Sequence, residues 1–140
     1  MKKVSPDEAR RLILEGKAPS EMHVRGSLDL RGCTSESLPE NLHVEGDLDL
    51  ERCSSLKSLP EGIHVGGWLY LGGCTSLKSM LEGLYVGGWL YLRGCTSLKS
   101  LPGGLHVGGN LDIVGCTSLK KLPYNIHVGG SILCDPELIE

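Results

Sequence analysis

The chain has 140 residues, 40% of them hydrophobic, and a formal net charge of −3 at pH 7. A weakly acidic chain lacks the basic face that nonspecific nucleic-acid binding needs, so we expect no nucleic-acid partner. No run of 18 apolar residues is present and the N-terminus carries no signal peptide, so we expect a cytoplasmic protein without membrane contact; export by a specialised secretion system would leave no such signal.

The first expected element is an α-helix over residues 6–15. Ser5 and Glu8 have the spacing of a capping box, and Pro6 lies between them at the first helical position. Leu12, Ile13 and Leu14 supply an apolar stripe, and Gly16 suits the position just after a helix end. We therefore assign residues 1–21 to an N-terminal helix and linker.

One motif of about 21 residues then repeats six times through the rest of the chain. The copy from Ile63 reads IHVGGWLYLGGCTSLKSMLEG, and the next reads LYVGGWLYLRGCTSLKSLPGG. Within WLYL, Leu69 and Leu71 alternate with Trp68 and Tyr70, which is the period of a strand with one buried face. We predict a mainly β repeat solenoid of parallel strands over residues 22–134.

Repeats contact only their neighbours, so an open end exposes the core and needs a cap. We expect the N-terminal helix to cover the first coil and residues 135–140 to form a short or truncated C-terminal cap. The run Ile63-His64-Val65 also alternates, so a coil carries either one strand or two strands joined at the glycine pair.

The spacing LxLxxCxxL resembles the leucine-rich repeat. In four copies a Leu-Pro pair follows, as in the short class of bacterial, effector-like leucine-rich-repeat proteins: Leu38-Pro39, Leu59-Pro60, Leu101-Pro102 and Leu122-Pro123. The resemblance covers residues 22–134. It implies a stack of coils that presents one strand face to a protein partner, and it leaves open that the chain is a fragment of a larger effector.

Stacking places equivalent residues of successive coils about 4.8 Å apart, so each repeat position becomes a column. We expect the cysteine column to be reduced, inward and free of metal, because zinc sites favour paired CxxC ligands and none occurs here. Its members are Cys33, Cys53, Cys74, Cys95 and Cys116. The histidines preceding each valine should point outward, as solvated residues or as a metal or pH-sensing array. No cofactor is expected.

The outward strand face carries the candidate binding residues. The only two tryptophans of the chain lie there with two of its four tyrosines, and clustered outward aromatics are typical of binding hot spots. The alternative is that these rings only support the sheet. The predicted contact residues are the anchors Trp68, Tyr70, Trp89 and Tyr91 and the polar rim Arg93, Asp47, Asp49 and Asp112.

No catalytic motif is recognisable, and Asp47 with Asp49 on an open sheet lacks the cleft that glycoside hydrolysis needs. The sequence therefore predicts a non-enzymatic scaffold that recognises a protein partner. The alternatives are a structural or self-associating repeat protein, dimerising through the aromatic face or the exposed C-terminal coil. An ice-binding surface built on the threonine column is a further alternative.

Overall fold

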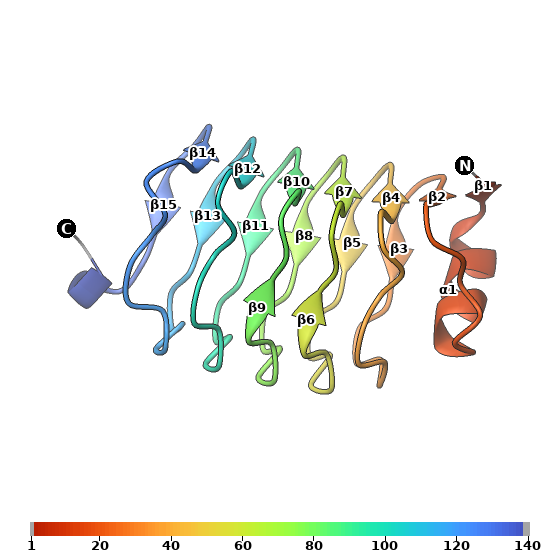
Figure 1. Cartoon of the computed structure of the whole chain (residues 1–140), viewed down its shortest axis with the longest axis horizontal. Coiled ribbons are helices and arrows are strands. Elements are labelled where there is room, and N and C mark those ends of the chain that lie inside the picture. Colours follow the sequence, from red (N-terminus) through yellow and green to blue (C-terminus); the bar gives the residue numbers. More distant parts are fainter. Residues whose placement is uncertain (1, 139–140) are drawn as a thin grey trace.

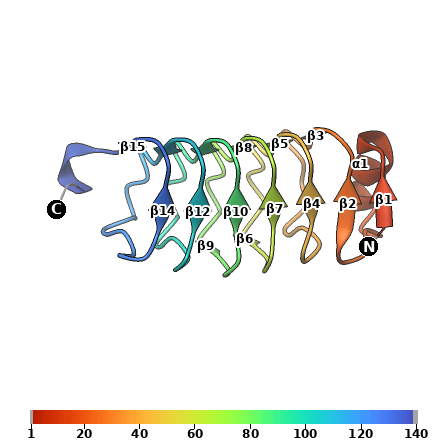
Figure 2. The same cartoon turned by 90° about the horizontal axis from the view of Figure 1, so that it is seen from above.

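The computed structural model describes residues 2–138 as a β-solenoid of about six coils, with about 21 residues in each coil and one α-helix at the N-terminal end (Figure 1). The parallel-strand solenoid predicted from the repeats is confirmed. The coils stack in a single row, with α1 (Pro6–Leu14) at one end and the 3-10 helix η1 (Pro136–Leu138) at the other (Figure 2).

Two parallel sheets run along the stack within residues 2–138. The first, here called the histidine sheet, contains β1 (Lys2–Val4), β2 (Met22–Val24), β4 (His43–Val44), β7 (His64–Val65), β10 (Tyr85–Val86), β12 (His106–Val107) and β14 (His127–Val128). The second, here called the aromatic sheet, contains β3 (Leu28–Asp29), β5 (Leu48–Asp49), β8 (Leu69–Tyr70), β11 (Leu90–Tyr91), β13 (Leu111–Asp112) and β15 (Ile132–Leu133). Each coil thus contributes a strand to both sheets, and β6 (Ser58–Leu59) pairs with β9 (Ser79–Met80) on a third side.

A glycine pair forms the corner between the two sheets in the last four repeats, and Arg25-Gly26 and Glu45-Gly46 take its place in the first two. The Gly87 N–H donates to the Val65 carbonyl of the preceding coil at 2.8 Å. A Cβ atom on Gly87 would collide with the carbonyl oxygen of Gly66, and one on Gly108 would collide with that of Gly87. The later coils thus approach backbone to backbone at this corner, and a side chain at Gly87 or Gly108 would force the backbone to shift.

The core is a single apolar column enclosed by the coils. Leu69 and Leu71 are fully buried, as are Leu90 and Leu92 of the next coil, which confirms the predicted strand register. Leu90 pairs directly with Leu69 and with Leu111 in the parallel ladder. Each inward residue therefore packs against its equivalents one coil before and one coil after.

The N-terminal helix covers the first coil, as the capping argument predicted. Its N-terminus is capped by the Ser5 hydroxyl, which accepts from the Glu8 N–H at 3.2 Å, and its buried residues are Ala9 and Ile13. The predicted stripe is wrong at Leu14, which is 42% exposed, because Ala9 lies one turn before Ile13 on the inward face. Strand β1 was not predicted; it pairs with β2 and extends the histidine sheet by one strand.

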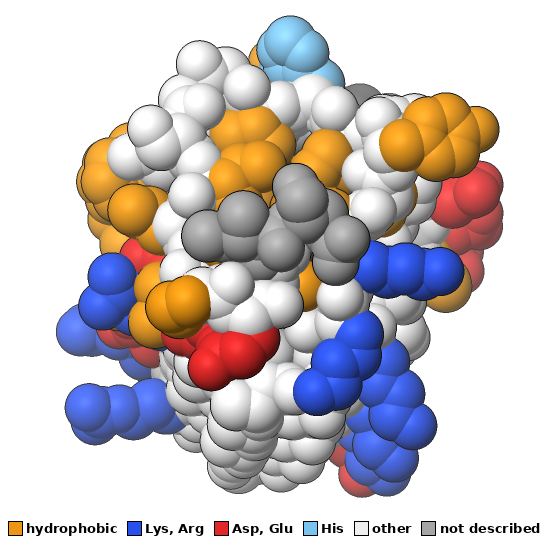
Figure 3. Space-filling view, turned by 90° about the vertical axis from the view of Figure 1, so that its left-hand side faces the viewer, with side chains coloured by type: hydrophobic (Ala, Val, Ile, Leu, Met, Phe, Trp, Pro, Cys, Tyr) orange, Lys and Arg blue, Asp and Glu red, His pale blue; other side chains and the backbone are white. Residues whose placement is uncertain are grey.

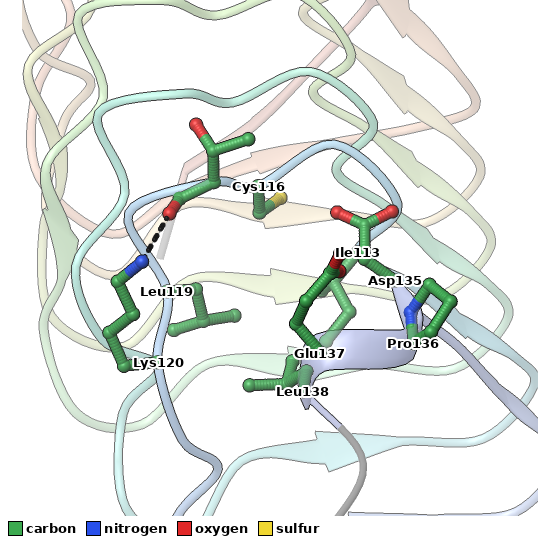
Figure 4. Close-up of a pocket in the computed structure, with 9 residues that line it drawn as sticks. Ile113, Cys116, Leu119, Lys120, Asp135, Pro136, Glu137 and Leu138 are labelled. Atoms are coloured by element: carbon green, nitrogen blue, oxygen red, sulfur yellow. Dashed lines mark hydrogen bonds between the residues drawn. The ribbon is translucent and has the colours of Figure 1, made fainter.

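The C-terminal end is less well covered. Within the described residues, β14 and β15 each pair with a strand on one side only, and Ile132 is 40% exposed. Apolar side chains gather across this end of the molecule (Figure 3). Helix η1 borders a hollow of about 470 Å³, which Ile113, Cys116 and Leu119 of the preceding coil also line (Figure 4). The core is thus closed by a helix at one end and only partly covered at the other.

Candidate binding face

The outer side of the aromatic sheet consists of three columns of side chains, one residue of each column coming from every coil. The first column is Ser27, Asp47, Trp68, Trp89, Asn110 and Ser131; the second is Asp29, Asp49, Tyr70, Tyr91, Asp112 and Leu133; the third is Arg31, Glu51, Gly72, Arg93, Val114 and Asp135. Alternation along each strand directs these columns away from the buried leucines. Seven of the eight predicted contact residues remain partly or largely accessible on this face.

The two tryptophans form the centre of this face. Their indole rings stack with centroids 4.6 Å apart and planes inclined by 6°. Tyr70 lies beside Trp68 at 5.6 Å, and Tyr91 lies 6.4 Å from Tyr70. All four rings are half-buried, so the cluster is a continuous aromatic surface rather than a set of projecting side chains.

Polar residues of the first column have a structural role that the sequence analysis missed. The Ser27 hydroxyl accepts from the Asp47 N–H at 2.9 Å, and Asp47 Oδ1 accepts from the Trp68 N–H at 2.8 Å. Asn110 Oδ1 accepts from the Ser131 N–H at 2.8 Å in the same way. The signal was present in the sequence, because every non-aromatic member of the column carries a side-chain oxygen.

The tryptophans occupy this column without supplying such an acceptor, because an indole ring can only donate. Instead, each indole lies over the glycine pair of the next coil. A Cβ atom on Gly88 would collide with Trp68 Cδ1, and one on Gly109 would lie 2.6 Å from Trp89 Cδ1. Two coils of the stack therefore carry a large aromatic side chain where the others carry a side-chain oxygen that binds a backbone N–H of the next coil.

An acidic group borders the aromatic surface on the side of the first coils. Asp47, Asp49 and Glu51 come from one coil, and Asp49 Oδ1 also accepts from the Glu51 N–H at 3.1 Å. Burial raises the pKa of the Tyr70 hydroxyl, and these three carboxylates raise it further. The border beside Tyr70 is therefore negatively charged.

Arg93 borders the aromatic surface on the opposite side. Its Nε lies 2.8 Å from Asp112 Oδ2, and the Arg93 guanidinium carbon lies 6.0 Å from the Tyr91 ring centroid. The carboxylate of Asp112 raises the pKa of Arg93, whose side chain is half-exposed.

Asp112 itself was predicted to be a rim contact, but the structure buries it. Its residue is only 2% exposed, because Arg93 covers one carboxylate oxygen while the other accepts from the Val114 N–H at 3.2 Å. Asp112 thus positions Arg93 and is not itself available to a partner.

The histidine sheet carries a column of stacked rings on its outer side. The rings are His23, His43, His64, Tyr85, His106 and His127, with successive centroids 4.2 to 4.7 Å apart. Tyr85 takes the place of a histidine in this column, but its ring stacks on both neighbours and the column is continuous. Partial burial lowers the pKa of His43 and of His64. The charges of His64 and His23 lower the pKa of His43 further, and that of His23 lowers the pKa of His64.

The cysteine column is inward in four of its five members. Cys53, Cys74, Cys95 and Cys116 are buried, whereas Cys33 of the first coil is half-buried. All are free thiols. Burial raises the pKa of Cys74 to about 11 and that of Cys95 to about 12.

Residues 2–138 contain no group of three or more histidine, cysteine, aspartate or glutamate side chains arranged to hold a metal ion. Among residues 2–138, no helix is long and apolar enough to cross a bilayer.

Comparison with models of protein families, with curated proteins and with solved structures finds no match. The resemblance to leucine-rich repeats therefore rests on the repeat motif alone.

Proposed function

We propose that the protein is a non-enzymatic scaffold that binds a protein partner through the outer side of the aromatic sheet. Trp68, Tyr70, Trp89 and Tyr91 anchor the partner, and Asp47, Asp49 and Arg93 surround them as a polar rim. The rim differs from the one expected from the sequence only in Asp112, which acts through Arg93.

The observation that carries this proposal is the exchange in the first column. Ser27, Asp47 and Asn110 each accept a hydrogen bond from a backbone N–H of the next coil through a side-chain oxygen. The coils therefore stack with small polar residues at this position. Trp68 and Trp89 forgo that hydrogen bond in the two central coils. Large rings that the fold does not need, placed at the centre of an accessible face, have the composition and position of a binding hot spot.

The charges around the rings indicate the chemistry of the partner. A segment with an aliphatic or aromatic side chain would cover the tryptophan stack, since such contacts dominate interface energies. A lysine or arginine of that segment would reach Asp47 and Asp49, and an acidic residue would reach Arg93. The opposite charges at the two borders fix the direction in which the segment lies.

A display library of peptides selected on the wild-type chain tests this proposal. Peptides that bind are expected to combine apolar residues with a basic residue and to lose affinity for Trp68→Ala and Trp89→Ala. The fully exposed Tyr124 provides a matched aromatic control, because Tyr124→Ala leaves the candidate face unchanged. Selected peptides that bind all variants equally would contradict the proposal.

Self-association through the C-terminal coil is the second candidate function. Within the described residues, the outer edges of β14 and β15 have no partner strand, which favours this function. Ile132 of β15 is also 40% exposed. Two such ends brought together would complete both sheets and cover the apolar cross-section. Sedimentation tests this candidate: Ile132→Lys should convert a dimer into a monomer, whereas Trp89→Ala should not.

A further inference from the structure

The thiols of Cys33 and Cys53 lie one above the other in the first two coils, with their sulfur atoms 3.4 Å apart. The two residues occupy equivalent turns of successive coils. The Cys33 N–H donates to the Leu30 carbonyl at 3.0 Å, and the Cys53 N–H donates to the Leu50 carbonyl at 3.1 Å. A disulfide bond joins sulfur atoms about 2.05 Å apart and tolerates the spacing of neighbouring strands. The two thiols therefore need only a small side-chain movement to be joined.

Cys33 differs from the other cysteines of its column in exposure, and the sequence explains the difference. In the later coils a buried leucine follows the cysteine three residues on: Leu56, Leu77, Leu98 and Leu119. The first coil is one residue shorter, and the exposed Glu36 stands in that place after Cys33. Without a leucine in this turn, Cys33 stays half-buried while Cys53 is fully buried.

The buried thiols are also held by hydrogen bonds. The Cys53 thiol donates to the Leu30 carbonyl at 3.0 Å, and Cys74, Cys95 and Cys116 donate at 3.1 Å to the equivalent carbonyls of their preceding coils. Burial raises the pKa of Cys53 to about 12. Within the column, a dissolved oxidant thus meets Cys33 first, and the Cys53 sulfur lies 3.4 Å from it.

We propose that Cys33 and Cys53 are a redox pair that forms a reversible disulfide when the protein meets a peroxide. The Cys33 thiol gives up its proton as its sulfur attacks one peroxide oxygen. The O–O bond breaks, Cys33 becomes a sulfenic acid, and the other oxygen takes up the released proton and leaves as water. The Cys53 sulfur then attacks the Cys33 sulfur, loses its proton, and displaces the sulfenic oxygen as a second water. One hydrogen peroxide is reduced by two electrons to two waters while two thiols become one disulfide, and a dithiol reductant restores them.

The consequence of the bond is a cross-link between the first two coils. The helix α1 packs on the first coil, so the disulfide ties the N-terminal cap to the body of the solenoid. Closing this loop restricts the unfolded chain and is expected to raise the midpoint of unfolding. The pair would make the N-terminal cap more stable under oxidising conditions than under reducing ones.

Peptide mapping tests the proposal, because cleavage after lysine and arginine leaves each cysteine in its own peptide. The full chain is treated with hydrogen peroxide, its free thiols are alkylated, and it is digested with trypsin. The expected product links residues 32–52 to residues 53–57, with four of the six cysteines still alkylated. Dithiothreitol should remove the link and restore all six thiols.

Two variants complete the experiment. Cys33→Ser should abolish the cross-link and the peroxide-induced rise in the unfolding midpoint, whereas Cys134→Ser should retain both, since Cys134 lies in the last coil. The proposal is overturned by six free thiols after peroxide, by Cys33 ending as a sulfinic acid without a cross-link, or by links that join other cysteines equally. The wild-type peptide map decides the matter even if a variant folds poorly.

Discussion

The indole rings of Trp68 and Trp89 are 21 residues apart in the sequence and stack with their centroids 4.6 Å apart. This distance is close to the spacing of paired strands, so the period of the coil itself brings the rings together. In this way two ordinary repeats produce one aromatic surface that neither coil could form alone. Each tryptophan also lies over a glycine of the next coil, which gives the surface a defined position on the sheet.

The close backbone packing at the glycine corner predicts a large difference between two alanine substitutions. Gly108→Ala would bring a Cβ atom into the Gly87 carbonyl, and overpacking of this kind costs about 1–3 kcal/mol of unfolding free energy. Gly103→Ala meets only ordinary contacts with Asn125 and should change stability by less than about 0.5 kcal/mol. Urea unfolding of both variants measures the difference, and equal midpoints would contradict the corner as described.

The histidine column predicts a loss of stability in acid. The pKa of His43 and of His64 is lowered in the folded state, so the unfolded chain takes up protons first as the pH falls below 6.5. The stability that these two neutral imidazoles contribute is complete above pH 6.5 and decreases as the pH falls below it. The groups facing His43 are His23, His64 and Glu45, of which only Glu45 opposes the shift.

His64→Tyr provides a matched variant, because Tyr85 already stacks in the same column. It removes one titrating ring and should keep the stacking. Urea midpoints measured from pH 8 to pH 5 should therefore fall less steeply for His64→Tyr than for the wild type. Identical slopes would show that the histidine column does not govern the acid response.

The Arg93–Asp112 pair should contribute more to stability than the Arg31–Asp29 pair. Asp112 is buried, so Arg93→Gln leaves its carboxylate without its partner and should lower the urea midpoint of unfolding. Both members of the Arg31–Asp29 pair are more than half-exposed, so Arg31→Gln should lower that midpoint less. Adding Asp112→Asn to Arg93→Gln should recover part of the loss, and a double variant no more stable than the single one would contradict the assigned role.

The cysteine column predicts two classes of thiol. Cys53, Cys74, Cys95 and Cys116 are buried with raised pKa values, so they should react with a thiol reagent at neutral pH only after denaturation. Cys33 and Cys134 are half-buried and should react in the native protein. Cys74→Asp should cost several kcal/mol, about the penalty for an unpaired charge in the core. Rapid reaction of all six thiols would contradict the core packing.

Repeat period and alternation were enough to predict the solenoid, the buried Leu69 and Leu71 and the outward Trp68 and Tyr70, because these depend only on chain geometry. The burial of Asp112 could not be predicted from alternation, because it depends on a contact with Arg93 in the preceding coil. The pairing of β1 was missed because a three-residue strand carries too little periodicity to be recognised. The ring column continues through Tyr85 because Tyr85 pairs in register with His64 and His106, and replacing one ring by another does not change that register.

The affinity of a selected peptide for Trp89→Ala is the most direct test of the proposed binding face. Truncating a central aromatic anchor costs about 2 kcal/mol or more, so the dissociation constant should rise at least about tenfold. Trp89 is stacked and half-buried, so some loss of stability is also expected, and titration calorimetry should be done well below the unfolding midpoint. Tyr124→Ala should bind like the wild type. If Trp89→Ala is folded and binds the peptide with unchanged affinity, the aromatic surface is structural and does not anchor the partner.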